Sequence, residues 1–198
     1  WDAEPFEMKL QKSTATTEAA VDLFEKAGRW MDRGNLEGAA RFYRAALEAD
    51  ADLAEARYNL GIVYQRMGRC EEAAACYRKT LTQRPDDFSA LNNLGQVLSL
   101  TGKTAQAELI YRQAMGLDPR RAEPHFNLAE LAMSTGALKK AVTHYRKAIQ
   151  LQPVMVEAYN NLGTAFQKQG SYQAAVKCYR KVVGLKPELP VMGLRMFF

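Results

Sequence analysis

Residues 156–189 read VEAYNNLGTAFQKQGSYQAAVKCYRKVVGLKPEL. The stretch contains two apolar stripes at helical spacing, which are separated by Gly170 and followed by Pro187. Glycine takes the left-handed conformation that ends many helices at little cost, and proline cannot continue a helix. The stretch therefore predicts two helices joined by a short turn, with a further turn after the second helix.

This arrangement recurs every 34 residues along the chain. Four residue types each recur at 34-residue spacing, and this agreement excludes a repeat that arises by chance. The recurring positions are Gly34, Gly68, Gly102, Gly136 and Gly170; Ala39, Ala73, Ala107, Ala141 and Ala175; Tyr43, Tyr77, Tyr111, Tyr145 and Tyr179; and Pro85, Pro119, Pro153 and Pro187. The predicted units are 20–53, 54–87, 88–121, 122–155 and 156–189. Residues 1–19 form an N-terminal extension in this division.

Each unit predicts a first and a second helix that pack against one another. The small residue at the eighth position of a unit, such as Gly61, lets the two helices approach closely, and the tyrosine at position 24 fills the remaining space. The first unit departs most, because Asp50-Ala51 stands where the other units have proline. The predicted fold is an all-α solenoid of five stacked helix-turn-helix units, with about ten helices in total.

These units resemble the tetratricopeptide repeat, whose signature is W-x2-L-G-x2-Y…A…F/Y…A…P. Leu60-Gly61 with Tyr64, and Leu162-Gly163 with Phe166, match that signature closely. The resemblance covers residues 20–189. It implies a right-handed superhelix in which the first helices line a concave groove and the second helices lie mostly on the convex side. Such folds bind extended peptides or partner helices in the groove.

Composition is ordinary for a folded protein and excludes several classes. The chain has 198 residues, 47% of them hydrophobic and 25% charged, and no run approaches the length of a membrane-spanning helix. Cys70, Cys76 and Cys178 are an odd number without a C-x-x-C pair, which argues against both a disulfide framework and a structural zinc site. Free thiols favour a reducing, cytoplasmic location, and the periplasm stays open.

The predicted groove positions carry a column of amides with aromatic neighbours. An amide offers a donor and an acceptor at each step, which suits the backbone of an extended peptide. The column resembles the asparagine ladder in the superhelix of O-linked N-acetylglucosamine transferase, whose repeats also read N-N-L-G. Asparagine is also common at this position of the consensus repeat, where it bonds along the helix. The predicted peptide-binding residues are Tyr58, Asn59, Asn92, Asn93, Phe126, Asn127, Asn160 and Asn161.

Charge is unevenly distributed between the two predicted faces. The groove positions hold six acidic and two basic residues, although the whole chain has a net charge of +5. An acidic groove favours polar or basic ligand segments and argues against nucleic acid there. The acidic residues are Glu25, Asp32, Glu55, Glu123, Glu130 and Glu157, and the basic ones are Arg66 and Lys168.

The second helices carry arginine at position 25 of every unit. The residues are Arg44, Arg78, Arg112, Arg146 and Arg180. A basic stripe could dock an acidic partner or an anionic membrane surface. The favoured interpretation is an ordinary solvated helix face, since Tyr-Arg-Lys is typical of such repeats.

Catalytic and cofactor signals are missing from the sequence. Gly102-Lys103-Thr104 matches the end of a phosphate-binding loop, but Val97 replaces the first glycine and no strand precedes it. His125 and His144 are the only histidines, and counting along the two antiparallel helices of their unit places them near opposite levels, which makes a poor metal site. We expect no enzyme activity, no cofactor and no metal.

Both ends of the chain are expected to contact something else. Residues 1–14 show no regular pattern, and residues 190–198, PVMGLRMFF, are apolar enough to begin a further helix or to dock. The leading interpretation is a scaffold that binds a peptide or helix of a partner protein or a subunit of a complex, with homo-oligomers left open. The alternatives are the substrate-recruiting arm of a larger enzyme, such as a glycosyltransferase, and a self-assembling or peripherally membrane-associated organiser.

Overall fold

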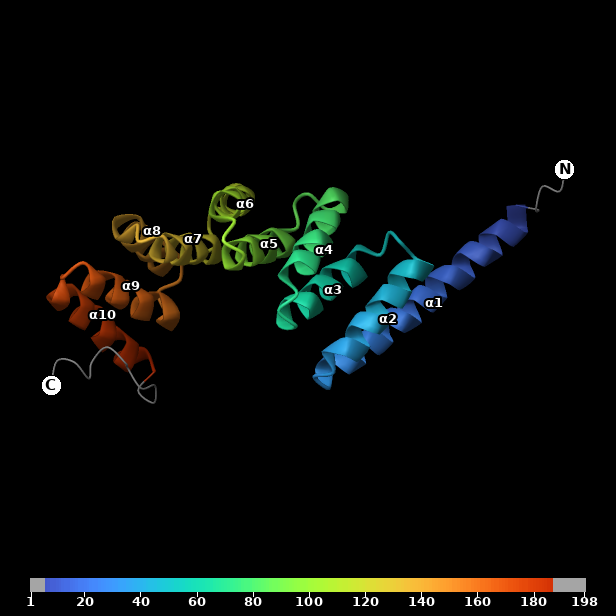
Figure 1. Cartoon of the computed structure of the whole chain (residues 1–198), viewed down its shortest axis with the longest axis horizontal. Coiled ribbons are helices and arrows are strands. Elements are labelled where there is room, and N and C mark those ends of the chain that lie inside the picture. The colour runs from blue at the N-terminus through green and yellow to red at the C-terminus, as the bar shows by residue number, and fades with distance from the viewer. Residues whose placement is uncertain (1–5, 187–198) are drawn as a thin grey trace. The chain divides into compact units, whose positions relative to one another are not determined.

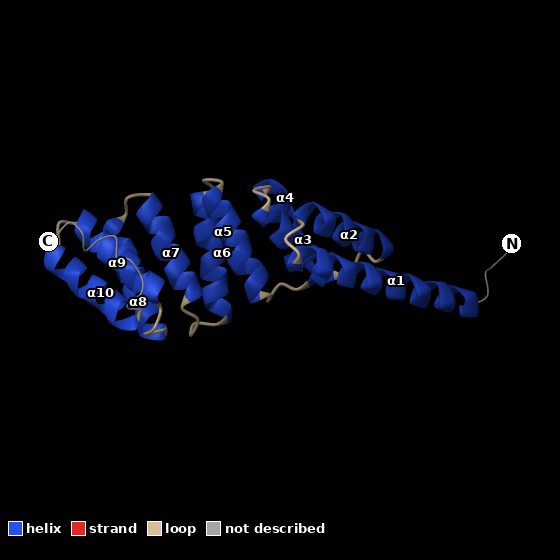
Figure 2. Cartoon of the chain, turned by 90° about the horizontal axis from the view of Figure 1, so that it is seen from below, coloured by secondary structure: helices blue, strands red, loops and turns tan. Residues whose placement is uncertain are grey.

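The computed structural model describes residues 6–186, and it describes the side chains of the first helix from residue 17 onward (Figure 1). Over that range the chain forms ten helices joined by short loops, and no strand is present (Figure 2). The helices are α1 (Phe6–Asp32), α2 (Leu36–Ala49), α3 (Ala54–Arg66), α4 (Cys70–Gln83), α5 (Phe88–Leu100), α6 (Thr104–Leu117), α7 (Glu123–Ser134), α8 (Leu138–Leu151), α9 (Val156–Lys168) and α10 (Tyr172–Leu185). The predicted all-α repeat fold is confirmed.

The chain divides into an N-terminal unit up to Gly102 and a C-terminal unit from Lys103. In the N-terminal unit, α1 packs on α2, α3 packs on α4, and α2 and α4 each contact the first helix that follows them. The C-terminal unit repeats this pattern, with α7 on α8 and α9 on α10, and with α6 and α8 contacting α7 and α9. Every helix is therefore stabilised by its neighbours in sequence, which is typical of repeat proteins.

Five glycines make the turns inside the predicted hairpins. Gly34, Gly68, Gly102, Gly136 and Gly170 have φ angles between +73° and +75°. No other described residue has a positive φ. A side chain is strained in this region, so the period-34 glycines are explained by backbone conformation, as the sequence predicts.

The tyrosines at position 24 form the centre of each hairpin. All five are 2% exposed or less, and the residues are Tyr43, Tyr77, Tyr111, Tyr145 and Tyr179. A Cβ atom at residue 61 would lie 2.6 Å from Cε1 of Tyr77, and one at residue 163 would lie 2.6 Å from Cε1 of Tyr179. The small residue on the first helix is thus required by the aromatic ring of the second.

The first hairpin differs from expectation at its N-terminus. Residues 1–14 were expected to lack regular structure, yet α1 begins at Phe6 and has 27 residues, against 14 in α2. Figure 1 shows α1 continuing past the end of α2. Residues 6–19 contain neither glycine nor proline, so nothing in that stretch ends the helix. The predicted apolar segment at residues 190–198 lies outside the described residues.

The turn without proline is held by a buried arginine. Arg57 is only 6% exposed. Its Nη1 donates to Oε1 of Gln83 at 2.7 Å, and its Nη2 donates to the carbonyl oxygen of Ala51. Gln83 in turn donates to the carboxylate of Asp52 at 3.2 Å. The guanidinium thereby ties α3 and α4 to the loop that leads into them, where the other units rely on proline.

Candidate peptide-binding surface

In the N-terminal unit, the first helices bring an amide and a phenol together. Asn93 on α5 donates its Nδ2 to the hydroxyl oxygen of Tyr58 on α3 at 3.0 Å. Tyr58, Asn59, Asn92 and Asn93 are all half-buried. Burial raises the pKa of Tyr58, and hydrogen bonds from Ser89 and Asn93 oppose that rise. The phenol therefore stays protonated at neutral pH and keeps a proton to donate.

In the C-terminal unit, the first helices carry a carboxylate held by two donors. Asn161 on α9 donates its Nδ2 to Oε1 of Glu130 on α7 at 2.8 Å. The hydroxyl of Tyr145, from α8, donates to the same oxygen. Asn160 donates to Oδ1 of Asn161 at 3.4 Å. Glu130 itself is exposed, so these two bonds hold a carboxylate in a fixed position that remains accessible from solvent.

The aromatic residues predicted for ligand contact also support the fold. Tyr58 lies against Tyr77 with ring centroids 5.8 Å apart, and Phe126 lies against Tyr145 at 5.8 Å. Phe24 makes the same contact with Tyr43 at 5.6 Å. Such inclined aromatic pairs stabilise packing beyond the area they bury. Tyr58 and Phe126 are half-buried, so only the exposed part of each ring is accessible to a ligand.

The predicted asparagines differ in how accessible they are. Asn127 is only 9% exposed, whereas Asn59, Asn92, Asn93, Asn160 and Asn161 are half-buried. The hydrogen bonds of Asn93 and Asn161 to Tyr58 and Glu130 use amide N–H groups. An amide oxygen has two acceptor positions, so these bonds orient the amides without using all their capacity. The ligand-contact role of all eight residues stays a prediction.

Two glutamines belong to this surface although the sequence did not single them out. The hydroxyl of Tyr77 donates to Oε1 of Gln65 at 2.8 Å, and that of Tyr179 donates to Oε1 of Gln167 at 3.1 Å. Gln65 also donates to Gln96 on the next first helix at 3.4 Å. Gln65 and Gln167 both stand at the twelfth position of their unit, and this recurrence was the sequence signal that could have identified them. The hydroxyls of Tyr77 and Tyr179 are thus each bonded to a glutamine at the edge of the candidate surface.

The arginines on the second helices are exposed but not equivalent. Arg112 forms an ion pair with Glu108, one turn earlier on α6, at 2.8 Å. Arg146 lies over the ring of Phe166 on α9, 5.4 Å from its centroid. Two of the five predicted stripe residues therefore already have partners within the C-terminal unit, and the face is not a uniform row of solvated charges.

The histidines are closer together than expected. Nδ1 of His125 on α7 and Nδ1 of His144 on α8 are 3.3 Å apart, and both rings are largely buried. The expectation that they lie near opposite levels was wrong, because the packing of α7 on α8 brings the two ring centroids to within 5.6 Å of one another. Burial lowers the pKa of both imidazoles. No group of three or more metal-ligating residues occurs in the described part of the chain.

None of the described helices is long and apolar enough to cross a membrane.

The three thiols are unpaired, and burial raises the pKa of the Cys76 thiol to about 11. A protonated thiol is a poor nucleophile, so the raised pKa argues against a nucleophilic role for Cys76.

Family models for the tetratricopeptide repeat match residues 52–120 and 156–189, and a further TPR repeat model matches residues 30–68 and 130–170. The chain belongs to the tetratricopeptide repeat family. Repeats of this family generally mediate protein–protein interactions. A comparison with curated proteins found no match.

Solved structures share the fold. MamA from Desulfovibrio magneticus RS-1 is 22% identical, with a TM-score of 0.78 over 85% of this chain and 96% of that chain. PilF of Pseudomonas aeruginosa is 24% identical, with a TM-score of 0.74 over 86% of this chain and 78% of its own. YrrB, described as a TPR protein with an unusual peptide-binding site, is 22% identical, with a TM-score of 0.70 and complete coverage of both chains.

Proposed function

We propose that the protein is a scaffold that binds an extended segment of a partner protein along the surfaces formed by its first helices. The observation that carries the proposal is the pair of bonds from Asn93 to Tyr58 and from Asn161 to Glu130. Each bond orients an amide at a half-buried position between consecutive first helices. Oriented amides lower the entropy cost of binding a peptide backbone.

The chemistry of the surface favours a ligand with N–H donors or cations. Glu130 already accepts from Asn161 and Tyr145, and its exposed carboxylate has further acceptor capacity. Half-buried Phe126 and Tyr58 offer apolar area beside the polar groups. A basic or neutral peptide with an apolar side chain therefore suits these surfaces better than an acidic one.

The test is selection of peptides from a random dodecapeptide library, followed by titration of the best sequence with the full chain. We expect Asn93→Ala with Asn161→Ala to weaken binding about tenfold, since two polar contacts are lost. Thr82→Ala with Thr143→Ala changes two exposed second-helix hydroxyls and serves as the matched control. Unchanged affinity of the asparagine variant would remove the proposal.

The resemblance of the amide column to that of O-linked N-acetylglucosamine transferase supports a second use of the same surface, as the substrate-recruiting arm of a larger enzyme. In that case the selected peptides should contain an acceptor site for the attached catalytic domain. A scaffold would instead select a segment of a stable partner. A membrane-associated organiser would depend on the arginines and not on the asparagines.

A further inference from the structure

The last two second helices have an unbalanced charge. Helix α8 carries four lysines and arginines and α10 carries three, and neither contains Asp or Glu. Helices α2, α4 and α6 each balance their basic residues with glutamates. Positive charge is therefore concentrated on one pair of helices rather than spread along the repeat.

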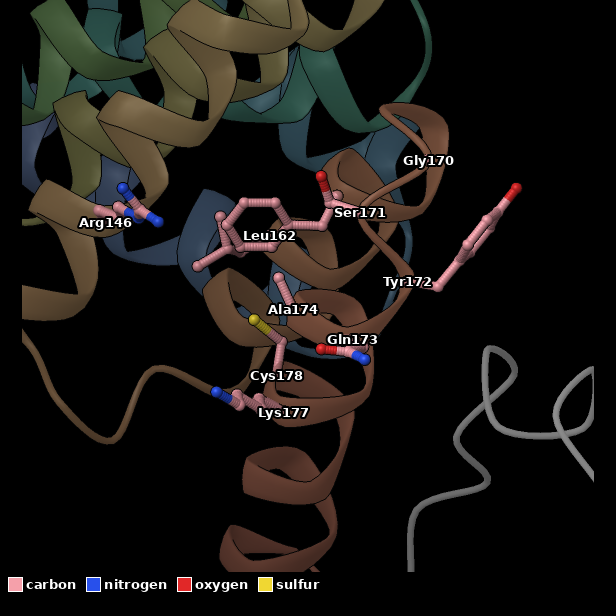
Figure 3. Close-up of a pocket in the computed structure, with 10 residues that line it drawn as sticks. Arg146, Leu162, Gly170, Ser171, Tyr172, Gln173, Ala174, Lys177 and Cys178 are labelled. Atoms are coloured by element: carbon pink, nitrogen blue, oxygen red, sulfur yellow. The ribbon is translucent and has the colours of Figure 1, made fainter.

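A hollow of about 750 Å³ is lined by Arg146 of α8, by residues of α9 and α10, and by the loop between α9 and α10 (Figure 3). Leu162, Phe166 and Cys178 contribute apolar surface, and Arg146 and Lys177 contribute the charges. Figure 3 shows Arg146 and Lys177 on the side of the hollow that Cys178 faces, while Tyr172 points away. Among the residues that the structure describes, no acidic side chain lines it.

The equivalent position one hairpin earlier is an internal control. There the space between α6 and α8 is only about 70 Å³, and Glu108 lines it beside His144. Glu108 pairs with Arg112 at 2.8 Å and cancels its charge. In α8 the residue four before Arg146 is Val142, so Arg146 has no such carboxylate on its own helix and lies over Phe166 instead.

We propose that this hollow docks an acidic segment of a partner protein through one apolar anchor side chain. The apolar anchor side chain packs against Leu162 and Phe166. The cations Arg146 and Lys177 attract carboxylates of the segment beside it. Concave shape favours a polypeptide, because a flat bilayer or a nucleic acid backbone would contact the charges without filling the space.

The test uses the full chain and two labelled octapeptides, DEEFLEED and DEEGSEED, measured by fluorescence anisotropy. The first carries an apolar pair and the second has the same charge without it. We expect DEEFLEED to bind more tightly, and its affinity to fall as salt rises, because the charges are exposed. Arg146→Gln with Lys177→Gln should weaken it about tenfold.

The matched control is Arg78→Gln with Lys79→Gln, which removes two exposed cations from α4 and changes the net charge equally. Affinity should then stay within about twofold. Equal loss in both double variants, equal affinity for the two peptides, or no binding by the unaltered chain would overturn the proposal. Displacement of DEEFLEED by phosphatidylglycerol vesicles or single-stranded DNA at lower concentration than by unlabelled peptide would also overturn it.

Discussion

The side-chain amide of Asn161 donates to the carboxylate of Glu130 on the preceding hairpin at 2.8 Å, and the buried hydroxyl of Tyr145 donates to the same oxygen. One carboxylate therefore links three helices of the C-terminal unit. It is also exposed enough to meet a ligand. The structural role of Glu130 and its proposed role in binding therefore coincide.

Glu130→Ala should lower the free energy of unfolding by about 1–2 kcal/mol, because the hydroxyl of Tyr145 loses its acceptor in a largely buried position. Glu130→Gln keeps an acceptor oxygen and should cost less. Urea unfolding followed by circular dichroism measures both. A double-mutant cycle with Asn161→Ala should give a coupling of about 0.5–1.5 kcal/mol, and a coupling of zero would contradict the contact.

Gly61→Ala should destabilise the N-terminal unit by about 1–3 kcal/mol, since the added Cβ would lie 2.6 Å from the ring of Tyr77. Gly116 in α6 is the matched control, because nothing lies within 4 Å of its would-be Cβ. Gly116→Ala should stabilise by about 0.4–1 kcal/mol through helix propensity and unfolded-state entropy. Thermal melts that give both changes the same sign would refute the packing argument.

The histidine pair should make stability depend on pH. Burial lowers the pKa of His125 and His144, and the charges of Lys147, Lys140 and Arg112 add to this, while Glu108 opposes it at His144. A histidine with a lowered pKa binds fewer protons folded than unfolded, so its stabilisation is full above the unfolded pKa near 6.5 and is lost as pH falls through the folded value.

His144→Phe, which installs the residue found at this position in the first hairpin, should flatten that decline. Chemical unfolding between about pH 8 and pH 5 measures the effect. His125→Gln is the companion variant, since it removes the titration while keeping a polar side chain. An acid-side slope that stays the same in both variants would rule out the pair as its source.

Arg57→Met should lower the free energy of unfolding by about 1–3 kcal/mol, because Gln83 and the carbonyl of Ala51 lose their donor in a buried site. Arg57→Lys should have a free energy of unfolding between those of the unaltered protein and Arg57→Met, because a lysine lacks the forked guanidinium that donates to both acceptors. Pro substitution at Ala51, where later units have proline, should recover part of the loss. Stability measured by denaturant titration that is insensitive to Arg57→Met would exclude the bridging role.

The repeat itself could be predicted because its determinants are local. Gly68 is needed for a positive φ, and Gly61 is needed by the ring of Tyr77, so each leaves a residue type at a fixed position. The early start of α1 was missed because the repeat pattern begins at residue 20, whereas a helix continues until a breaker appears. The absence of glycine and proline from residues 6–19 was the available signal.

The candidate site was predictable only in outline. The repeat spacing places Asn93 and Asn161 on first helices. It does not reveal that Asn93 donates a hydrogen bond to Tyr58 and that Asn161 donates one to Glu130. Those partners depend on how consecutive hairpins stack, which is a tertiary property. The proximity of His125 and His144 was missed for the same reason, because counting along helix axes omits the angle at which helices pack.

The buried phenols at position 24 give the protein an intrinsic optical reporter. Burial raises the pKa of Tyr77, Tyr111 and Tyr145, so these rings remain un-ionised in alkali for as long as their hairpins are closed. Phenolate absorbance at high pH would then report the opening of individual hairpins without any added dye, and replacing one tyrosine at a time by phenylalanine would assign each step of the trace to its place in the array.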